Sequence, residues 1–177
     1  TSYLDGTIKD IRIWNVTRSA EEIAANIDKT LAGNEAGLMH YWKMDAREGL
    51  LIQDSTVSQN NIMPTVYWSG DIELPEEETG YSNDGFNFSA GAKWETTKSV
   101  GASVGTVEAW VKVPKATEDD KRLTIISAYP DSSFHMDIYS KGRPRLYYTN
   151  GAGEDVSYVA NVDVRTNEWT HIAWTCD

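Results

Sequence analysis

The sequence lacks several features that define common protein classes. It contains a single cysteine, Cys176, so no disulfide can form within the chain, and a small disulfide-stapled scaffold is excluded. Its longest uninterrupted apolar runs cover only a few residues, far short of a transmembrane helix. We therefore expect no insertion into a membrane from this sequence.

Basic residues are scarce beside acidic ones. The chain has 16 Lys and Arg against 27 Asp and Glu, which gives a formal net charge of −11. Proteins that bind nucleic acid need Lys and Arg to displace counterions from phosphates. We therefore expect no nucleic-acid partner, and the same charge disfavours an anionic membrane surface.

The sequence is rich in the alternation of apolar and polar residues that is typical of strands with one buried face. At positions 105–113, this pattern places Val107, Ala109, Val111 and Val113 on one face. Further candidate strands lie at 7–14, 38–44, 84–88, 123–128, 134–139, 145–149, 156–160 and 169–176. Many strands separated by turn signals predict an all-β protein built as an antiparallel β-sandwich.

One short helix is expected near the N-terminus. Ser19 and Glu22 have the spacing of a capping box, in which the Ser19 hydroxyl accepts a hydrogen bond from the Glu22 amide. Apolar residues then recur on one helical face, at Ile23, Ile27 and Leu31. Gly33 follows as the expected C-terminal stop. The pattern predicts a helix packed on a sheet.

Three segments resemble motifs of the laminin-G-like jelly roll, a fold of the concanavalin A-like lectin/glucanase superfamily. Residues 5–15 read DGTIKDIRIWN and, with the helix that follows, are similar to the family's closing strand and helix. Residues 105–112 read GTVEAWVK and resemble its central strand. Residues 167–175 read NEWTHIAWT and resemble its Trp-x-His-(Val/Ile)-Ala strand. The resemblance covers most of the chain and implies a concanavalin A-like jelly roll.

The order of these motifs differs from the family's order. The closing strand and helix come first, in residues 1–33, and the opening and central strands follow in residues 37–177 without the family's last strands. One interpretation is a tandem array, in which 1–33 ends one jelly roll and 37–177 begins the next. In the other, 1–33 completes 37–177 or a neighbouring chain, because an incomplete sandwich exposes open strand edges that pair with a neighbouring domain or chain.

The sequence offers no catalytic constellation. Relatives that hydrolyse glycosides need two carboxylates flanking the scissile bond, and on one face of a strand these would stand at alternate positions. Glu108 on the predicted central strand instead has Thr106 and Trp110 at those positions. We therefore expect a protein that is not an enzyme, with no catalytic residues.

Aromatic residues are the candidate ligand-binding groups, since the chain has 7 Trp and 9 Tyr against 3 Phe. Lectin-like jelly rolls hold sugars on aromatic rings, and Tyr and Trp combine an apolar ring with a polar group. The expected ligand-binding residues surround one loop: Tyr147, Tyr148, Tyr158, Asn150 and Asp155. The tryptophans in family-like strands are expected to pack in the core or against a sheet instead, at Trp14, Trp42, Trp110, Trp169 and Trp174.

Calcium is the one cofactor that the resemblance implies, because many members of the superfamily bind it through loop carboxylates and carbonyl oxygens. Asp45 and Asp54 end and follow the predicted opening strand, and they are the expected metal ligands. The alternative, that these side chains only cap their own turns, stays open.

These features imply a non-catalytic adhesion or carbohydrate-binding module of a larger surface protein, located outside the cell or at the cell surface. Its expected partner is a glycan or a cell-surface or matrix protein. Two alternatives remain: a structural spacer or interaction module in a tandem array, and an accessory domain of a glycoside hydrolase.

Overall fold

Antiparallel strands make up most of the described structure. The computed structural model describes residues 6–44, 51–64, 81–82, 85–88, 94–98, 105–118, 122–127 and 134–176. The strands are β1 (Gly6–Trp14), β2 (Leu38–Trp42), β3 (Ile62–Pro64), β4 (Tyr81–Ser82), β5 (Gly85–Phe88), β6 (Trp94–Thr96), β7 (Thr106–Lys112), β8 (Leu123–Ser127), β9 (Phe134–Tyr139), β10 (Arg143–Thr149), β11 (Asp155–Val159) and β12 (Trp169–Thr175). Helix α1 (Ala20–Asn26) lies between β1 and β2, and the 3₁₀ turn η1 (Ser140–Gly142) lies between β9 and β10. The predicted all-β, antiparallel class is confirmed. In the described part of the chain, no helix has the length and apolar character needed to cross a membrane.

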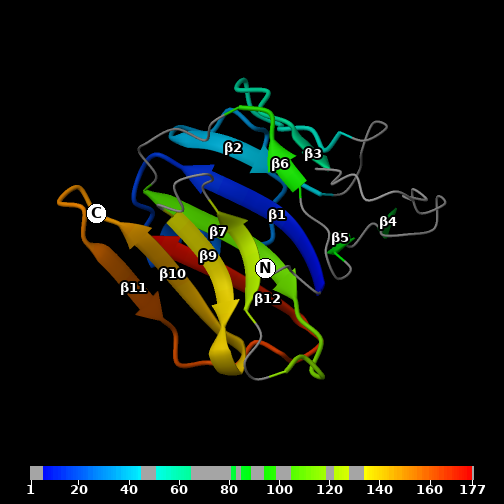
Figure 1. Ribbon diagram of the computed structural model, residues 1–177. Helices are drawn as coiled ribbons and strands as arrows, with labels where there is room; N and C mark the ends of the chain where they lie inside the picture. Colours follow the sequence, from blue (N-terminus) through cyan, green and yellow to red (C-terminus); the bar gives the residue numbers. More distant parts are fainter. Residues whose placement is uncertain are drawn as a thin grey trace, which may run out of the picture.

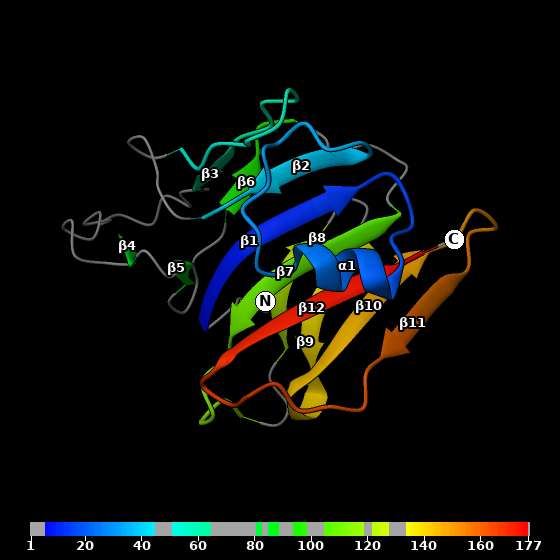
Figure 2. The ribbon, with the colours of Figure 1, turned by 180° about the vertical axis from the view of Figure 1, so that it is seen from behind.

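Two sheets pack face to face. The six-stranded sheet has the order β12-β7-β1-β5-β4, with β2 also paired to β1, and the four-stranded sheet has the order β11-β10-β9-β8. The strands β3 and β6 pair separately. Figure 1 shows the four-stranded sheet in front of the six-stranded one, and Figure 2, from behind, shows α1 lying over β7 and β12.

The core fills the space between the sheets. On β7, the predicted apolar face is buried, with Val107, Ala109, Val111 and Val113 at most 1% exposed. From the other sheet, Leu123, Met136 and Ile138 belong to the same apolar cluster. The period-2 alternation therefore identified the inner face of the central strand correctly.

Strand β1 lies inside the six-stranded sheet. It pairs antiparallel with β7 on one side, and with β2 and β5 on the other. A register shift lies between Lys9 and Arg12, and Asp10 within it has a φ of +50°. The extra residue of such a bulge shifts by one position the alternation of side chains between the two faces of the strand. Ile8, before the bulge, and Ile13, after it, therefore both face the core. Residues 1–33 thus contribute a strand that pairs within the same chain, while the division of the chain into domains stays a prediction.

The predicted helix is real but shorter than the apolar stripe indicated. Ser19 and Glu22 form the full capping box. The helix ends at Asn26, well before Gly33, so the expected C-terminal stop was wrong. The physical reason is tertiary, because the buried Arg12 guanidinium donates to the carbonyl oxygens of Asn26 at 3.0 Å and Lys29 at 2.7 Å, and so turns the chain there.

Candidate functional site

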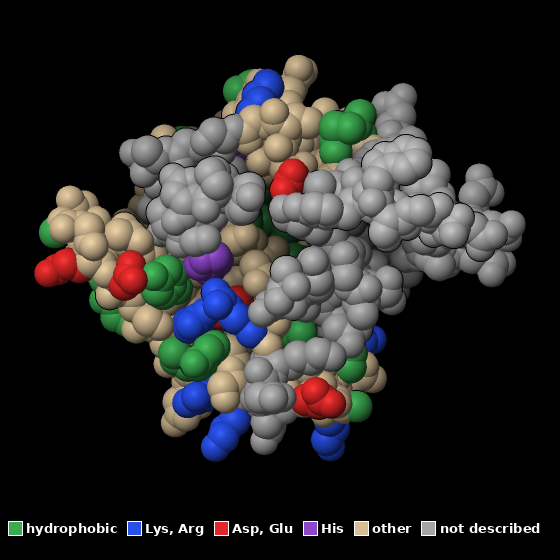
Figure 3. Space-filling view, viewed as in Figure 1, with side chains coloured by type: hydrophobic (Ala, Val, Ile, Leu, Met, Phe, Trp, Pro, Cys, Tyr) green, Lys and Arg blue, Asp and Glu red, His purple; other side chains and the backbone are tan. Residues whose placement is uncertain are grey.

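Polar and aromatic side chains gather on the outer face of the four-stranded sheet. Met136 and Ile138 point into the core, so the alternating neighbours on β9, and their partners on β10, point outward. We call this set the β9–β10 outer face: His135, Asp137, Tyr139, Arg145 and Tyr147. Figure 3 views the molecule from this side and shows histidine and basic side chains over β9 and β10.

The Asp137 carboxylate is the anchor of this face. It is fully buried and accepts hydrogen bonds from Arg122 Nε at 2.7 Å and from Arg145 Nε and Nη2 at 3.0 and 2.6 Å. The two contacts from Arg145 form a bidentate pair, which fixes the plane of its guanidinium. Arg145 also lies over the Tyr139 ring, 4.3 Å from its centroid. Two guanidinium groups share one carboxylate, so this part of the face carries a net positive charge.

His135 lies beside these charges. Its Nδ1 is buried and has no hydrogen-bond partner among the residues that the structure describes. Its ring centroid is 5.6 Å from that of Tyr147. Burial lowers the pKa of His135, the charges of Arg122 and Arg145 lower it further, and Asp137 only partly opposes them. The imidazole is therefore neutral at pH 7.

The structure divides the predicted ligand-binding residues between two faces. Tyr147 and Asp155 lie together on the β9–β10 outer face side, where a hydrogen bond to Asp155 raises the pKa of Tyr147. Tyr148 and Tyr158 lie on the opposite face, since Tyr158 stands across from the buried Leu146. The strand geometry thus separates Tyr147 from its neighbour Tyr148.

Asn150 shapes the turn between β10 and β11. Its Oδ1 accepts hydrogen bonds from the amides of Ala152 and Glu154, at 3.0 and 2.9 Å. Its Nδ2 donates to the Glu154 carboxylate at 3.0 Å. These contacts are the ones that turn-forming asparagines make with neighbouring backbone.

The Asp54 carboxylate, one of the two predicted calcium ligands, accepts hydrogen bonds from neighbouring protein groups. Its Oδ1 accepts from the amides of Tyr41 and Thr56 and from the Thr56 hydroxyl, and its Oδ2 accepts from His40 Nδ1 and the Asn60 amide. Five donors fill the roughly four lone-pair sites of a carboxylate. The other predicted ligand, Asp45, lies outside the described residues. Within the described ranges no group of three acidic, His or Cys side chains is placed to hold a metal. Calcium binding stays a prediction.

Glu108 belongs to a buried network on the helix side of the six-stranded sheet. It is 2% exposed, accepts from Trp14 Nε1 at 2.8 Å, and lies 3.1 Å from His171 Nε2. Arg12 Nη1 is 3.8 Å from the same carboxylate. A carboxylate enclosed in this way holds the sheet and the α1 segment together and has no access for a substrate.

The tryptophans of the predicted strands fall into two groups, one in the core and one at the surface. Trp14 and Trp42 are buried, as predicted, at 1% and 0% exposure. Trp174 is partly buried and packs against the main core cluster. Trp110 and Trp169 are partly exposed and line a surface pocket instead. Sequence reasoning missed this pocket, because only the pairing of β7 with β12 brings the two rings together.

Residues 82–177 match a family model described as the concanavalin A-like lectin/glucanases superfamily, of laminin-G-like type. The match covers more than half of the chain. The chain belongs to this family. Laminin-G-like domains act as carbohydrate-binding or adhesion-type modules, are generally non-catalytic and are typically extracellular. Neither the comparison with curated proteins nor that with solved structures gives a match.

Proposed function

We propose that this protein is a non-catalytic, extracellular carbohydrate-binding module that holds a saccharide on the β9–β10 outer face, around Tyr147. One observation carries the proposal: the Tyr147 ring is partly exposed, and the Arg145 guanidinium, which Asp137 holds in a fixed orientation, lies 5.8 Å from its centroid. Rings of this kind stack against the apolar face of a pyranose, while neighbouring polar groups bind its hydroxyls.

The polar groups next to Tyr147 include a hydrogen-bond donor and a hydrogen-bond acceptor. Arg145 uses Nε and Nη2 for Asp137, so its Nη1 has no hydrogen bond within the described residues and is free to donate to a sugar. Asp155 is exposed and supplies carboxylate oxygens as acceptors at the hairpin end of the face. A saccharide lying across Tyr147 would contact a donor on one side and an acceptor on the other.

The charge distribution narrows the class of saccharide. The pairing of Arg122 and Arg145 with the single carboxylate of Asp137 leaves one positive charge at the Arg145 part of the face, while the Asp155 carboxylate lies at its hairpin end. The chain as a whole has a net charge of −11. On an acidic protein, a local positive charge attracts the anionic groups of a ligand at that site, while the rest of the surface repels them. We therefore expect glycans that carry a carboxylate to bind better than their neutral counterparts.

A glycan array comparing the protein with two tyrosine variants tests this function. Tyr147→Ala removes the stacking surface and should weaken binding about tenfold. Tyr158→Ala is the matched control, because Tyr158 is 54% exposed on the opposite face of the same hairpin and should leave binding unchanged. No binding to any glycan, or equal losses in the two variants, would overturn the proposal. A parallel array in EDTA shows whether binding needs calcium.

A second candidate function, pairing with a neighbouring domain or chain, is favoured by β12. Among the described strands it pairs only with β7, so one edge of Trp169–Thr175 is open. Open edges are templates for another strand. Sedimentation over a range of concentrations tests pairing between copies, and a mass that stays monomeric would exclude it.

A further inference from the structure

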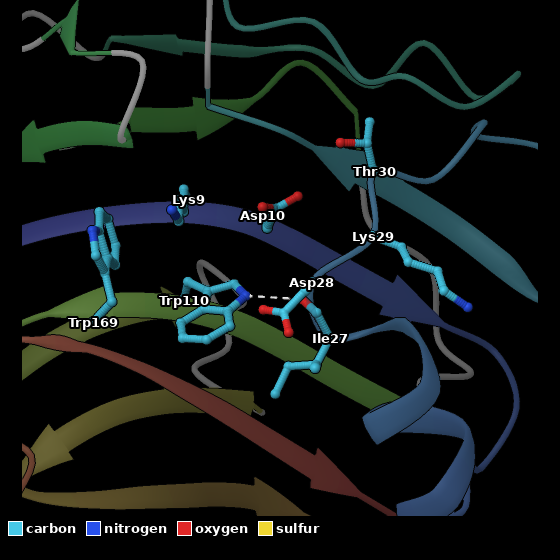
Figure 4. Close-up of a pocket in the computed structure, with 8 residues that line it drawn as sticks. All are labelled: Lys9, Asp10, Ile27, Asp28, Lys29, Thr30, Trp110 and Trp169. Atoms are coloured by element: carbon cyan, nitrogen blue, oxygen red, sulfur yellow. Dashed lines mark hydrogen bonds between the residues drawn. The ribbon is translucent and has the colours of Figure 1, made fainter.

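The surface pocket lined by Trp110 and Trp169 lies on the opposite side of the molecule from the β9–β10 outer face, over the outer surface of the six-stranded sheet. It encloses about 220 Å³. Figure 4 shows its lining residues: Lys9, Asp10, Ile27, Asp28, Lys29, Thr30, Trp110 and Trp169. They come from three adjacent strands, β1, β7 and β12, and from the segment that follows α1.

The Trp110 ring is the fixed floor of this pocket. Its Nε1 donates to the Ile27 carbonyl oxygen at 3.1 Å. The His171 ring meets it edge-on, with centroids 5.3 Å apart and planes at 62°. Figure 4 shows the face of the Trp110 ring turned toward the viewer, with Trp169 beside it. The ring is thus held in place, and it is partly exposed to the pocket.

A hydrogen-bond donor, Lys9, and a hydrogen-bond acceptor, Asp28, line the pocket beside the two tryptophan rings. The Lys9 Nζ lies 4.4 Å from the Trp169 ring centroid and 6.0 Å from that of Trp110, and has no acceptor among the described residues. Asp28 is exposed, and no donor within the described ranges reaches its carboxylate. Figure 4 shows this carboxylate close to the indole nitrogen end of the Trp110 ring, with Lys9 on the neighbouring strand β1.

The walls of the pocket are held by buried contacts. Arg12 is 1% exposed and donates to the carbonyl oxygens of Asn26 and Lys29, which fixes the turn that carries Asp28. On the other wall, the Asp10 carboxylate accepts from the Tyr41 hydroxyl at 2.6 Å. The bulge of β1 lies at the same place, and bulges are often found next to functional sites, where they re-aim a side chain.

We propose that this pocket binds one neutral hexopyranose residue, with its C–H face on Trp110 and its hydroxyls on Asp28 and Lys9. The volume is below the roughly 300–1,000 Å³ of sites for larger ligands, so it suits a single sugar unit. Two lysines and two aspartates line it, so its charge is balanced and favours no ion. The site is independent of the β9–β10 outer face, and together they make the module bivalent.

NMR titration of the whole chain with methyl glycosides tests this site. The probes are methyl β-galactopyranoside, methyl α-glucopyranoside and methyl α-mannopyranoside, with methyl β-glucuronide as the anionic comparison. At least one neutral probe should shift the indole N–H signals of Trp110 and Trp169 in a saturable way. Asp28→Asn should weaken that binding about tenfold, through loss of a charged acceptor. Glu118→Gln, at an exposed carboxylate outside the pocket, should leave it unchanged.

Three results would overturn the proposal: no shift with any neutral probe, shifts with the glucuronide alone, or unchanged affinity in Asp28→Asn. The Tyr147→Ala variant separates the two sites. It should weaken glycan binding at the β9–β10 outer face about tenfold and keep the indole shifts, so failure at one site is distinguishable from failure at the other.

Discussion

Ile13 of β1 lies directly opposite Val107 of β7, and both side chains are 1% exposed in the core between the sheets. The N-terminal strand is therefore an integral part of the core. Ile13→Ala should lower the free energy of unfolding by about 2–5 kcal/mol, because it removes buried methyl groups and leaves a cavity. Urea denaturation measures the loss.

The control for this variant is Val57→Ala, at a side chain that is 93% exposed. Its stability should stay within about 0.5 kcal/mol of the parent protein. If Ile13→Ala were as stable as the control, β1 would not be part of the folded sheet.

Glu108 should make the protein sensitive to acid. Burial raises the pKa of this carboxyl, but hydrogen bonds from His171 and Trp14 and the charge of Arg12 lower it more, so the net pKa lies below the usual 4.5. A lowered carboxyl pKa stabilises the fold above the unfolded-state value, and this stability is lost as the pH falls through the folded-state value.

Glu108→Gln should therefore cost about 3 kcal/mol near neutral pH, because the buried Arg12 loses one of its two carboxylate partners and keeps only Asp10, at 3.6 Å. It should also flatten the decline of stability below the usual glutamate pKa of 4.5. Urea unfolding across the acid range measures both effects. Glu168→Gln, at an exposed carboxylate, is the matched control. An acid profile identical in all three proteins would contradict the role given to Glu108.

Asp54 should stabilise the fold without a metal. It organises the β2 region by accepting from His40 and four other donors. Asp54→Ala leaves those buried donors unsatisfied and should cost about 2–4 kcal/mol. Thermal unfolding in calcium and in EDTA measures this cost, which should be the same in both. A cost seen only in calcium would mean that Asp54 is a metal ligand after all.

His135 should introduce a second pH dependence, at higher pH. Its pKa is lowered from the usual 6.5 by burial and by the charge of Arg122. Between the folded and unfolded values the unfolded chain binds more protons, so stability rises with pH in that window and falls as the pH drops below 6.5. His135→Gln should remove this slope, measured by chemical denaturation at several pH values.

Tyr139→Phe is the control for the histidine variant, because it changes the same outer face by removing only a hydroxyl group. Its stability should follow the pH dependence of the parent protein. A slope that persists in His135→Gln would assign the effect to another group.

The local pattern of apolar and polar residues in the sequence is enough to predict most strands and the start of the helix. The alternation at Val107 and Ala109 marks an inner face wherever the strand is placed, and the capping box fixes the start of α1 at Ser19. The end of α1 does not follow from the local pattern, because Arg12, which donates hydrogen bonds to the carbonyl oxygens there, is distant in the sequence. The strands β3, β4 and β6 were not predicted, since two or three residues are too few to show a period.

The candidate sites depend on register, which the sequence does not display. Adjacent Tyr147 and Tyr148 must point to opposite faces of a strand, and this signal was present but not used. The pairing of Asp137 with Arg145, in contrast, follows from the alignment of β9 with β10. The pocket at Trp110 requires β12 and β1 on either side of β7, which only the folded chain shows.

The central position of β1 has a consequence for how the chain folds. Trp14 on β1 and its partner Glu108 on β7 are 94 positions apart in the sequence. Sheets built on such distant contacts fold slowly, because a long loop must close before the contacts form. At ribosomal rates, roughly 5–20 seconds separate the synthesis of the two strands. During that interval β1 has no partner on the β7 side, and this is when the nascent chain is most exposed to mispairing and aggregation.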